Sequence, residues 1–445
     1  MIIKNYNQLA TTPQREQALQ IISAGIERVL PQNIIKQAIA YNPAGKSLTV
    51  NGDQYDFASG RLFIIGGGKA AGLMAQALES IISPDDITAG VVTCHNGGAE
   101  TKKIEIVKAS HPLPDIEGVK GVQQMLALKD QYKITEKDLV LCLISGGGSA
   151  LMPYPVEGVS LEEKQVITKD LLRSGASIDE VNIVRKHLSR VKGGQLGQYF
   201  SPTQVVSLIL SDVVGNDLST IASGPTTPDS TTFADVIEVL EKYNLFNQAP
   251  ASVVTHLKKG KPETPSVLPN CHNYIIGDNK LALEAMKDEA TGLGLKSVIV
   301  TAEEKGGPDE IIAAHIKEIK TGKYKDTDIL LMGGEPTPTL PDNPGEGGRN
   351  QYYAAAALLA LQKDNQNWLV ASMATDGSDF MPEIAGGVVD NNSLTDKNIT
   401  AQDIRQYLKN FDSYNLLTQL DNSLVITGKT GTNVGDLMVW MVWMV

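Results

Sequence analysis

Cysteine is scarce in this chain of 445 residues. Three are present, Cys94, Cys142 and Cys271, and neither a CxxC pair nor a cluster of histidines accompanies them. A disulfide framework and a zinc ribbon are therefore excluded, and a reducing, cytoplasmic location is expected.

Long apolar runs are also missing. No stretch approaches the roughly 18 consecutive apolar residues that a membrane helix needs. The N-terminus has no charged segment leading into an apolar run, so no signal peptide is predicted. The apolar end of the chain, residues 437–445, is too short to cross a bilayer and is interpreted as a last buried strand. We expect no membrane partner.

Basic residues are outnumbered by acidic ones. Lys and Arg total 39 and Asp and Glu total 51, which gives a formal net charge of −12. A molecule of this sign repels nucleic-acid phosphates and acidic lipids, so neither partner is expected. The hydrophobic fraction of 42% is enough to give two or three domains a core each.

Short apolar runs rich in β-branched residues alternate with helical patterns through both halves of the chain. This alternation indicates βαβ units on a largely parallel sheet. We predict an α/β fold of two domains, with a Rossmann-like, largely parallel sheet in residues 1–246 and a smaller α/β domain in residues 271–445. The linker is placed at 247–270, where four prolines and a lysine-rich turn occur. The sequence leaves open whether the last strand, at 437–445, packs within its own domain or back on the first domain.

A glycine-rich loop follows the predicted strand at 61–65. Gly66, Gly67 and Gly68 precede Lys69 at the start of a helix, which brings backbone N–H groups and an ammonium group together. This combination predicts an anion site, and a solvated first-turn lysine is the alternative interpretation of Lys69.

Two known phosphate-binding motifs do not fit this first loop. Ala70 stands where a Walker A loop requires Ser or Thr. A dinucleotide-binding loop would need an acidic residue after the next strand, 90–94, and none is present there.

A second loop of this kind follows the predicted strand at 139–144. Its three glycines can take positive φ and let the backbone approach a ligand closely. We interpret it as a phosphate or nucleotide site, with a tight structural turn as the alternative. Its residues are Ser145, Gly146, Gly147, Gly148 and Ser149.

Carboxylates follow two further predicted strands. Asp212 comes directly after the strand at 205–210, and Asp376 and Asp379 follow another buried strand. Ligands of open α/β sheets bind at the carboxyl ends of strands, so Asp212 is a candidate for holding Mg²⁺ or for accepting a proton. Both roles stay open, and an Asx turn is the structural alternative.

The second half repeats the combination of glycines, a cation and a carboxylate. An arginine fork at the start of a helix suits a carboxylate or a phosphate group. Glycine loops, cations and strand-end carboxylates together favour phosphoryl transfer, because that chemistry consists mostly of positioning and charge stabilisation. The residues concerned are Gly334, Glu335, Gly347, Gly348, Arg349 and Asn350.

A helix is predicted from 178 to 192. It begins with a capping box at Ser177 and Glu180. Its polar residues fall on the side opposite its apolar positions, and this arrangement favours a solvated face. They are Asn182, Arg185, Lys186 and Ser189.

Taken together, these segments resemble the glycerate 2-kinase family, whose C-terminal part is called the MOFRL domain. The resemblance covers residues from about 60 to 435, with the MOFRL region at about 328–437. The matching blocks, in the family's order, are GGGKAA (66–71), HPLPD (111–115), SGGGSALMPYP (145–155), SGASIDEVNIVRKHLSRVKGG (174–194), SDVVGNDLSTIASGP (211–225), GGEPT (333–337), GGRNQ (347–351), TDGSD (375–379) and TGTNVGDL (430–437).

The resemblance implies a function and a set of roles. It implies ATP- and Mg²⁺-dependent phosphorylation of D-glycerate on its 2-hydroxyl, in a cleft between two α/β domains. Whether the protein is a monomer or a homodimer stays open in the sequence. It makes Lys69 and Arg349 the catalytic pair, and it places Arg185 among the residues that bind nucleotide or substrate. Asn216 departs from the acidic residue that the family usually has there.

Two other functions remain as alternatives. The family has also carried the name hydroxypyruvate reductase, which would require NAD(P)H, and the missing acidic residue after the strand at 90–94 argues against that reaction. An anion-binding sensor would use the glycine loops but has no use for several strand-end carboxylates among cations.

Overall fold

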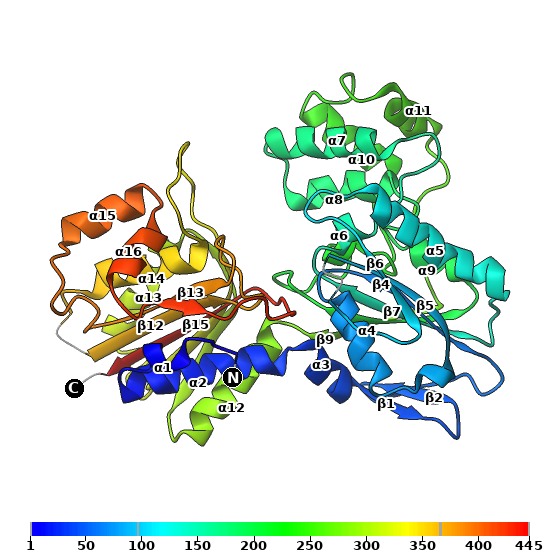
Figure 1. Cartoon of the computed structure of the whole chain (residues 1–445). Coiled ribbons are helices and arrows are strands. Elements are labelled where there is room, and N and C mark those ends of the chain that lie inside the picture. The colour runs from blue at the N-terminus through cyan, green and yellow to red at the C-terminus, as the bar shows by residue number, and fades with distance from the viewer. Residues whose placement is uncertain (1, 96–97, 365–366, 444–445) are drawn as a thin grey trace. The chain divides into compact units, whose positions relative to one another are not determined.

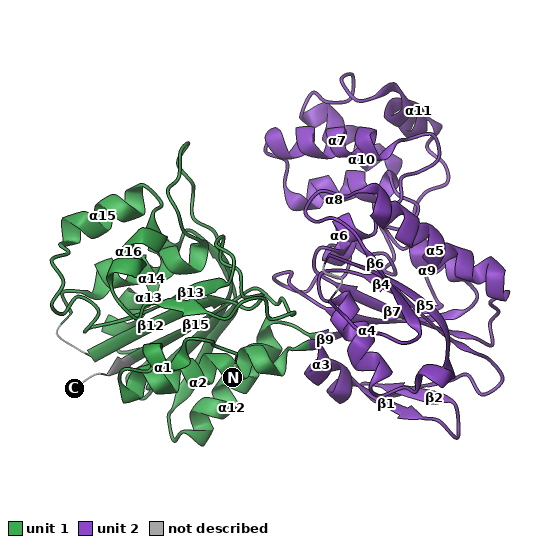
Figure 2. Cartoon of the chain, in the orientation of Figure 1, with its two compact units in different colours: residues 1–30, 277–445 green, residues 31–276 purple. Residues whose placement is uncertain are grey.

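The computed structural model describes residues 2–95, 98–364 and 367–443. The chain forms two compact units (Figure 2): unit 1 comprises residues 1–30 and 277–445, and unit 2 comprises residues 31–276. The two-domain α/β fold predicted from the sequence is confirmed. The limits of the units differ from the predicted limits, because the first 30 residues pack with the C-terminal part of the chain.

Unit 2 is built on a sheet with the strand order β6-β5-β4-β7-β8-β9 in the part of the chain that the structure describes (Figure 1). The strands from β6 to β8 pair in parallel. In chain order this arrangement is 3-2-1-4-5-6, the order of a Rossmann sheet, which confirms the Rossmann-like prediction. The strands are β4 (Leu62–Gly67), β5 (Ile87–Cys94), β6 (Ile104–Lys108), β7 (Leu139–Ser145), β8 (Gln204–Leu210) and β9 (Cys271–Gly277).

Helices and a small antiparallel sheet complete unit 2. The small sheet consists of β1 (Ile39–Asn42), β2 (Ser47–Val50) and β3 (Asp53–Asp56). The helices are α3 (Pro31–Ala38), α4 (Ala71–Glu79), η1 (Pro84–Asp86), α5 (Ile116–Tyr132), α6 (Gly148–Leu151), α7 (Leu161–Arg173), α8 (Ile178–His187), α9 (Gln195–Phe200), η2 (Ile221–Ser223), α10 (Phe233–Lys242) and α11 (Ala251–Lys259).

Helices α7, α8, α10 and α11 group apart from the sheet (Figure 1) and share a hydrophobic core of their own. The segment 247–270, expected to be a linker, contributes α11 to this group and buries Val253 and Leu257 in its core. Pro250 is the N-cap residue of α11, and the other three prolines, Pro262, Pro265 and Pro269, follow the helix in the irregular stretch before β9. The high proline content therefore belongs to a segment inside unit 2 and does not mark a domain boundary.

Unit 1 has a mixed sheet with the strand order β10-β11-β15-β12-β13-β14 among its described residues. Only β10 and β11 pair in parallel, so the largely parallel pattern expected from the alternation in this half is wrong. Its strands are β10 (Ser297–Gly306), β11 (Ile329–Pro336), β12 (Asn367–Ala374), β13 (Ile384–Asp390), β14 (Leu424–Ile426) and β15 (Asp436–Trp443). Short buried strands have the same composition in either direction, so the alternation alone does not reveal antiparallel pairing.

The last strand occupies the middle of this sheet. β15 pairs with β11 on one side and β12 on the other, and Leu437 to Met441 are buried. The indole N–H of Trp440 donates to the Tyr353 hydroxyl at 3.2 Å. The strand predicted for 437–445 is confirmed to residue 443 and its burial to residue 441, and residues 444 and 445 lie outside the described part. Its place is in unit 1, not on the first domain.

Helices lie on both sides of the unit 1 sheet (Figure 1). The helices α13, α14, α15 and α16 share a core with the sheet, and α2 packs against α12 and β15. Gly25 of α2 lies so close to α12 that an added Cβ would come within 2.6 Å of Met286 Cγ. The helices of unit 1 are α1 (Tyr6–Leu9), α2 (Pro13–Arg28), α12 (Asn279–Gly292), α13 (Pro308–Lys320), α14 (Arg349–Leu361), α15 (Ala401–Lys409) and α16 (Ser413–Gln419).

None of the described helices has the length and apolar character that a membrane span requires. None of the three cysteines, all of which the structure describes, forms a disulfide.

Candidate active site

The two predicted glycine loops of the first half meet in unit 2. They follow β4 and β7, which are neighbours at the point where the strand order of the sheet reverses. Open α/β sheets bind ligands at this point, outside the carboxyl ends of the strands. The Lys69 N–H donates to the Gly146 carbonyl at 2.8 Å, and the Ala70 N–H donates to the Ser145 hydroxyl at 3.0 Å.

The glycines of the first loop allow this close approach. Gly66 has φ of +142°, and a Cβ added there would lie 2.0 Å from the Leu143 carbonyl oxygen. A Cβ on Gly68, at φ +150°, would lie 2.1 Å from the Ser145 hydroxyl. A Cβ added to Gly67 would lie 2.3 Å from the Thr93 hydroxyl, so this position is confined as well. These glycines therefore serve to seat one loop on the other, with Lys69 carried at the junction.

A histidine lies beside the second loop. A Cβ added to Gly147 would come within 2.9 Å of the His111 ring and 3.0 Å of Lys69 Cγ. Burial, followed by the neighbouring charge of Lys69 and by His95, lowers the pKa of His111 to about 4. His111 is therefore a neutral ring at pH 7. Sequence reasoning noted its HPLPD block but assigned it no role, because a lone histidine before a proline carries no chemical pattern.

Asp212 lies against the same loop. A Cβ added to Gly146 would be 1.9 Å from Asp212 Oδ2, so the carboxylate of Asp212 faces the loop backbone at the end of β8. Asp217 of the same segment accepts hydrogen bonds from the Ser219 N–H and from the Thr220 hydroxyl, as in an Asx turn. No group of three His, Cys, Asp or Glu side chains able to hold a metal occurs in the described ranges.

A chain of hydroxyl and amide groups links the second loop to α8. The hydroxyls of Ser149 and Ser223 are 2.8 Å apart, and the Ser223 hydroxyl donates to Asn182 Oδ1 at 3.0 Å. Asn182 is buried, as is Lys186, which pairs with Asp229 at 3.2 Å. The solvated face expected for this helix is therefore wrong, because η2 and the chain after it cover the polar side of α8.

Three cations gather next to this chain: Lys164 of α7, Arg185 of α8, and Lys192. Burial, together with Arg185, lowers the pKa of Lys164 to about 7. Burial also lowers the pKa of Lys192 well below its ordinary value, and Lys164 and Arg185 lower it further. Sequence reasoning selected Arg185 and missed both lysines, because a lysine on an amphipathic helix or before two glycines is indistinguishable from a surface residue.

In unit 1, Arg349 begins α14 and is held by two carboxylates. Its Nε lies 2.6 Å from Asp436 Oδ2, its Nη2 donates to Asp436 Oδ1 at 3.1 Å, and its Nη1 pairs with Glu335. The side chain of Asp436 is fully buried, and burial raises its pKa to about 7 although Arg349 opposes the shift. Asp436 was not selected from the sequence, since it lies at the start of an apolar strand. The Arg349 guanidinium is 31% exposed and the Glu335 side chain 48%.

Other predicted residues of unit 1 hold the start of α14 in place. The carboxylate of Asp379 accepts hydrogen bonds from the Asn350 and Gln351 N–H groups at 3.0 and 2.9 Å. A Cβ added to Gly348 would lie 2.2 Å from Asp379 Cγ. Asn350 is buried and accepts a hydrogen bond from the Ser372 hydroxyl at 2.6 Å. This geometry gives Gly348, Asn350 and Asp379 a structural part.

The remaining predicted residues lie around these groups. A Cβ on Gly334 would lie 2.4 Å from the backbone of Glu304, and one on Gly347 would lie 2.2 Å from the Ser413 hydroxyl, so both glycines permit close packing. Asp376 is partly exposed, and its carboxylate accepts a hydrogen bond from the Ser378 N–H at 2.9 Å.

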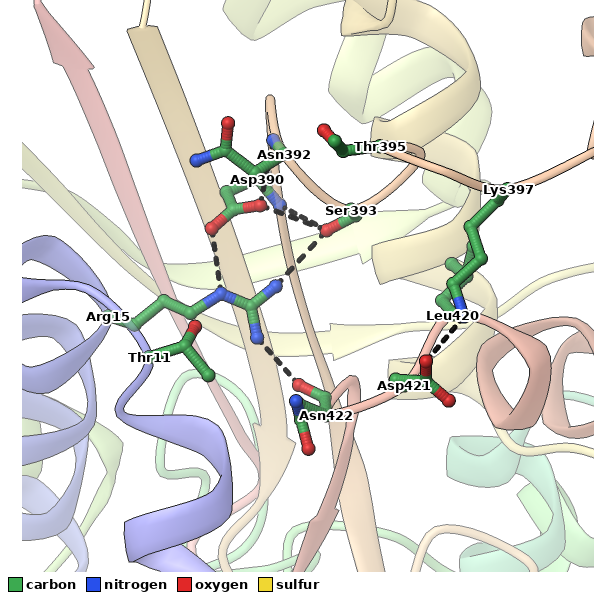
Figure 3. A pocket seen from close by; sticks show the side chains of 10 residues that line it. All are labelled: Thr11, Arg15, Asp390, Asn392, Ser393, Thr395, Lys397, Leu420, Asp421 and Asn422. Carbon is green, nitrogen blue, oxygen red and sulfur yellow. Dashed lines mark hydrogen bonds and ion pairs between the residues drawn. The ribbon is translucent and has the colours of Figure 1, made fainter.

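Unit 1 also contains a polar pocket of about 180 Å³, shown in Figure 3. Arg15 of α2 reaches into it and binds Asp390 at 2.7 Å, the Ser393 hydroxyl and the Asn422 carbonyl. The hydrogen-bond donors of the Arg15 guanidinium are thereby paired with acceptors of the protein itself. None of the residues predicted from the sequence lines this pocket, and the contacts of Arg15 fasten α2 to the C-terminal end of β13 and to the loops near it.

The fold and the loops define an α/β protein whose candidate ligand-binding point lies where β4 and β7 meet. Residues 17–258 match a domain of unknown function, DUF4147, and residues 328–436 match the MOFRL family, close to the region predicted at 328–437.

The chain is 39% identical over 435 residues to a D-glycerate 2-kinase of Thermotoga maritima, covering 96% of this chain and 97% of that protein. It is 36% identical over 438 residues to a glycerate 2-kinase of Pyrococcus horikoshii, with the same coverage. The crystal structure of a Thermotoga maritima glycerate kinase superimposes with a TM-score of 0.83 at 38% identity, covering 96% of this chain and 99% of that one. The chain belongs to the glycerate 2-kinase family.

The environment of His111 predicts an acid-sensitive fold. Its folded-state pKa of about 4 lies below the ordinary value of 6.5, so the unfolded chain binds the proton more readily and stability is lost as the pH falls from 7 towards 4. From pH 7 to pH 5 we expect His111 to account for a loss of about 1–2 kcal/mol. Guanidinium unfolding at both pH values measures it.

The substitution His111→Gln should abolish this part of the pH dependence, and Lys69→Met should reduce it. An unchanged difference between pH 7 and pH 5 in His111→Gln would show that the ring is protonated as freely in the fold as in the unfolded chain.

Proposed function

We propose that this protein transfers a phosphoryl group from ATP to the 2-hydroxyl of D-glycerate and releases 2-phospho-D-glycerate and ADP. The relatives that cover almost the whole chain carry the names of glycerate 2-kinases. The observation that carries the proposal is the pair of glycine loops at the switch point of the unit 2 sheet, with Lys69 at their junction. Phosphoryl transfer depends on such positioning and on charge stabilisation.

Lys69 and Arg349 supply positive charge to the reaction in different ways. The Lys69 ammonium acts as a point charge on phosphate oxygens beside the loop backbone. The Arg349 guanidinium keeps its two-bond contact with the buried Asp436, which fixes its plane. Its Nη1 is paired with the half-exposed Glu335, a contact that an incoming phosphate or carboxylate can replace.

Asp212 acts at the acceptor hydroxyl or at Mg²⁺. Its carboxylate faces the backbone of the second loop, close to where the phosphates are proposed to bind. A single carboxylate fits Mg²⁺, because this ion often takes one or two protein carboxylates together with water and substrate phosphates. When bound, Mg²⁺ would neutralise developing charge on the phosphate oxygens. As a base, Asp212 would instead accept the hydroxyl proton.

Hydroxypyruvate reduction is the less favoured alternative. A relative from Agrobacterium vitis, 36% identical over 385 residues, bears a provisional hydroxypyruvate reductase name. The first-loop glycines are confined by β7 and Ser145, and the strand β5 ends without an acidic residue that could bind a ribose hydroxyl. Incubation with NADH and hydroxypyruvate should therefore leave the absorbance at 340 nm unchanged.

We further propose a cytoplasmic enzyme that acts without a nucleic-acid or membrane partner, as a monomer or homodimer. The net charge of −12 and the lack of a disulfide among the three described cysteines support this.

The product of the reaction tests the proposed function. With Mg-ATP and D-glycerate, phosphorus NMR should show ADP and 2-phosphoglycerate forming in equal amounts. Formation of the 3-phospho isomer alone, or no release of ADP, would contradict the assignment.

The role of Asp212 is tested by Asp212→Asn, which keeps the size of the side chain and removes its charge. We expect kcat to fall by at least ~10²-fold, the scale of losing an acid–base group or a metal ligand. The substitution Asp217→Asn is the matched control in the same loop and should change kcat far less, since Asp217 only braces the turn. Near-normal turnover of a folded Asp212→Asn variant would assign Asp212 a purely structural place.

The third test concerns Lys69 and Arg349 together. We expect Lys69→Ala and Arg349→Lys each to lower kcat by roughly 10²–10³-fold, because a preorganised charge is lost in one and the two-bond geometry in the other. If both residues serve the same step, the double variant loses less than the product of the two single losses.

The exposed residues Lys120 and Arg405 provide controls as Lys120→Ala and Arg405→Lys, and circular dichroism verifies folding. Small, fully multiplicative losses, or a rise in KM alone, would show that Lys69 and Arg349 are only binding charges.

A further inference from the structure

We propose that Lys164, Arg185 and Lys192 form the subsite that binds the carboxylate of the acceptor. The inference rests on the proposed function, because it assigns one end of the substrate that this function names. It is carried by the side chains of unit 2 alone.

The two lysines are buried without a counter-charge. Lys164 is 7% exposed and Lys192 is 2% exposed. The Lys164 ammonium has no hydrogen-bond partner, and the Lys192 ammonium has only a long contact, 3.4 Å, with the Met152 carbonyl. None of the ion pairs formed by the described residues includes Lys164, Arg185 or Lys192.

Nearby carboxylates are already engaged with other side chains. Asp229 pairs with Lys186, Glu180 pairs with Lys242, and Glu263 lies 3.4 Å from His187. A lysine that is buried without a partner tends to give up its proton, because burial disfavours the charged form. A bound anion beside these amines would favour their charged forms and supply the opposite charge that the protein does not provide.

The cation group is continuous with the proposed phosphate loop. Met152, whose carbonyl Lys192 contacts, donates its N–H to the Gly148 carbonyl at 2.9 Å. On the other side, Asn182 lies three residues before Arg185 on α8 and accepts the hydrogen bond from Ser223, which contacts Ser149. Residues three apart share one face of a helix, so Arg185 lies on the same side of α8 as this chain of polar groups.

The burial of this group favours a small anion. Arg185 is the one partly exposed member of the three, so it marks the side from which a ligand arrives. A carboxylate has two oxygens and matches the fork of an arginine. A triphosphate is longer, and the glycine loops with Lys69 already offer it an extended run of backbone. We therefore assign the carboxylate of a small hydroxy acid to this subsite and the nucleotide phosphates to the loops.

Binding of the carboxylate should draw protons into the site. Burial and the neighbouring positive charge of Arg185 lower the pKa of the Lys164 and Lys192 amines, so a large share of them is unprotonated at pH 8. A bound anion favours their charged forms. Calorimetric titration of D-glycerate at pH 8, in two buffers of different ionisation enthalpy, measures the proton uptake. We expect roughly half a proton or more per molecule bound. Binding without proton uptake would overturn the proposal.

Substitution separates a binding role from a structural one. Lys164→Met and Lys192→Met replace a buried amine that has no ion-pair partner with an apolar side chain of similar size, so the unliganded variants should unfold at the same temperature as the wild type or a higher one. Their KM for D-glycerate should rise at least tenfold, while their KM for ATP stays within about twofold. The matched control is Lys186→Met on the same helix, which orphans Asp229 and should lower the unfolding temperature.

If Lys164→Met or Lys192→Met does not fold, the KM for D-glycerate is measured with Arg185→Gln, because Arg185 is partly exposed. A rise in KM for ATP instead of D-glycerate would overturn the proposal, as would an unchanged KM for D-glycerate in Arg185→Gln. The proposed function fails separately, since that failure would appear as a wild-type enzyme that forms no 2-phosphoglycerate.

Discussion

The close approach of β4 and β7 is the constraint on which the candidate site depends. At the carboxyl ends of these strands the two loops touch so tightly that only glycine fits at Gly66 and Gly68. The contact fixes the backbone from which Lys69 projects, and it places the second loop against Asp212 and His111. Because the strand order reverses between these strands, the helices that follow them leave the sheet on different sides and the loops stay accessible. The topology of the sheet thus places the two loops next to each other, and the glycines allow their backbones to pack in contact.

Buried cationic side chains in this protein fall into two kinds. Arg15 and Lys186 each hold a carboxylate, and each ties one element to another. Lys164 and Lys192 are as deeply buried as Lys186 but have no ion-pair partner among the described residues. Keeping a lysine buried without a partner costs stability, so this is the group that we assign to ligand binding.

Local patterns predicted much of the fold from the sequence. The helix predicted from residue 178 begins there as α8, and its capping box at Ser177 and Glu180 is present. The glycine loops were found because their residue types are unusual at strand ends. Three features were not predicted, since each depends on which distant element covers a surface. They are the packing of residues 1–30 with the C-terminal part of the chain, the central place of β15 in its sheet, and the burial of the polar face of α8. The same reason hid Lys164 and Lys192, whose burial is a tertiary property.

The central claim is that the acceptor and the nucleotide bind side by side at the end of the unit 2 sheet, with the acceptor carboxylate on the cation group. The most direct measurement is a crystal structure of the protein with D-glycerate and a non-hydrolysable ATP analogue. The account predicts phosphate oxygens on the backbone N–H groups of the Gly146–Ser149 loop beside Lys69, and the carboxylate within hydrogen-bond distance of Arg185. Phosphates lodged on Arg185 and Lys192, or a carboxylate bound away from α8, would contradict it.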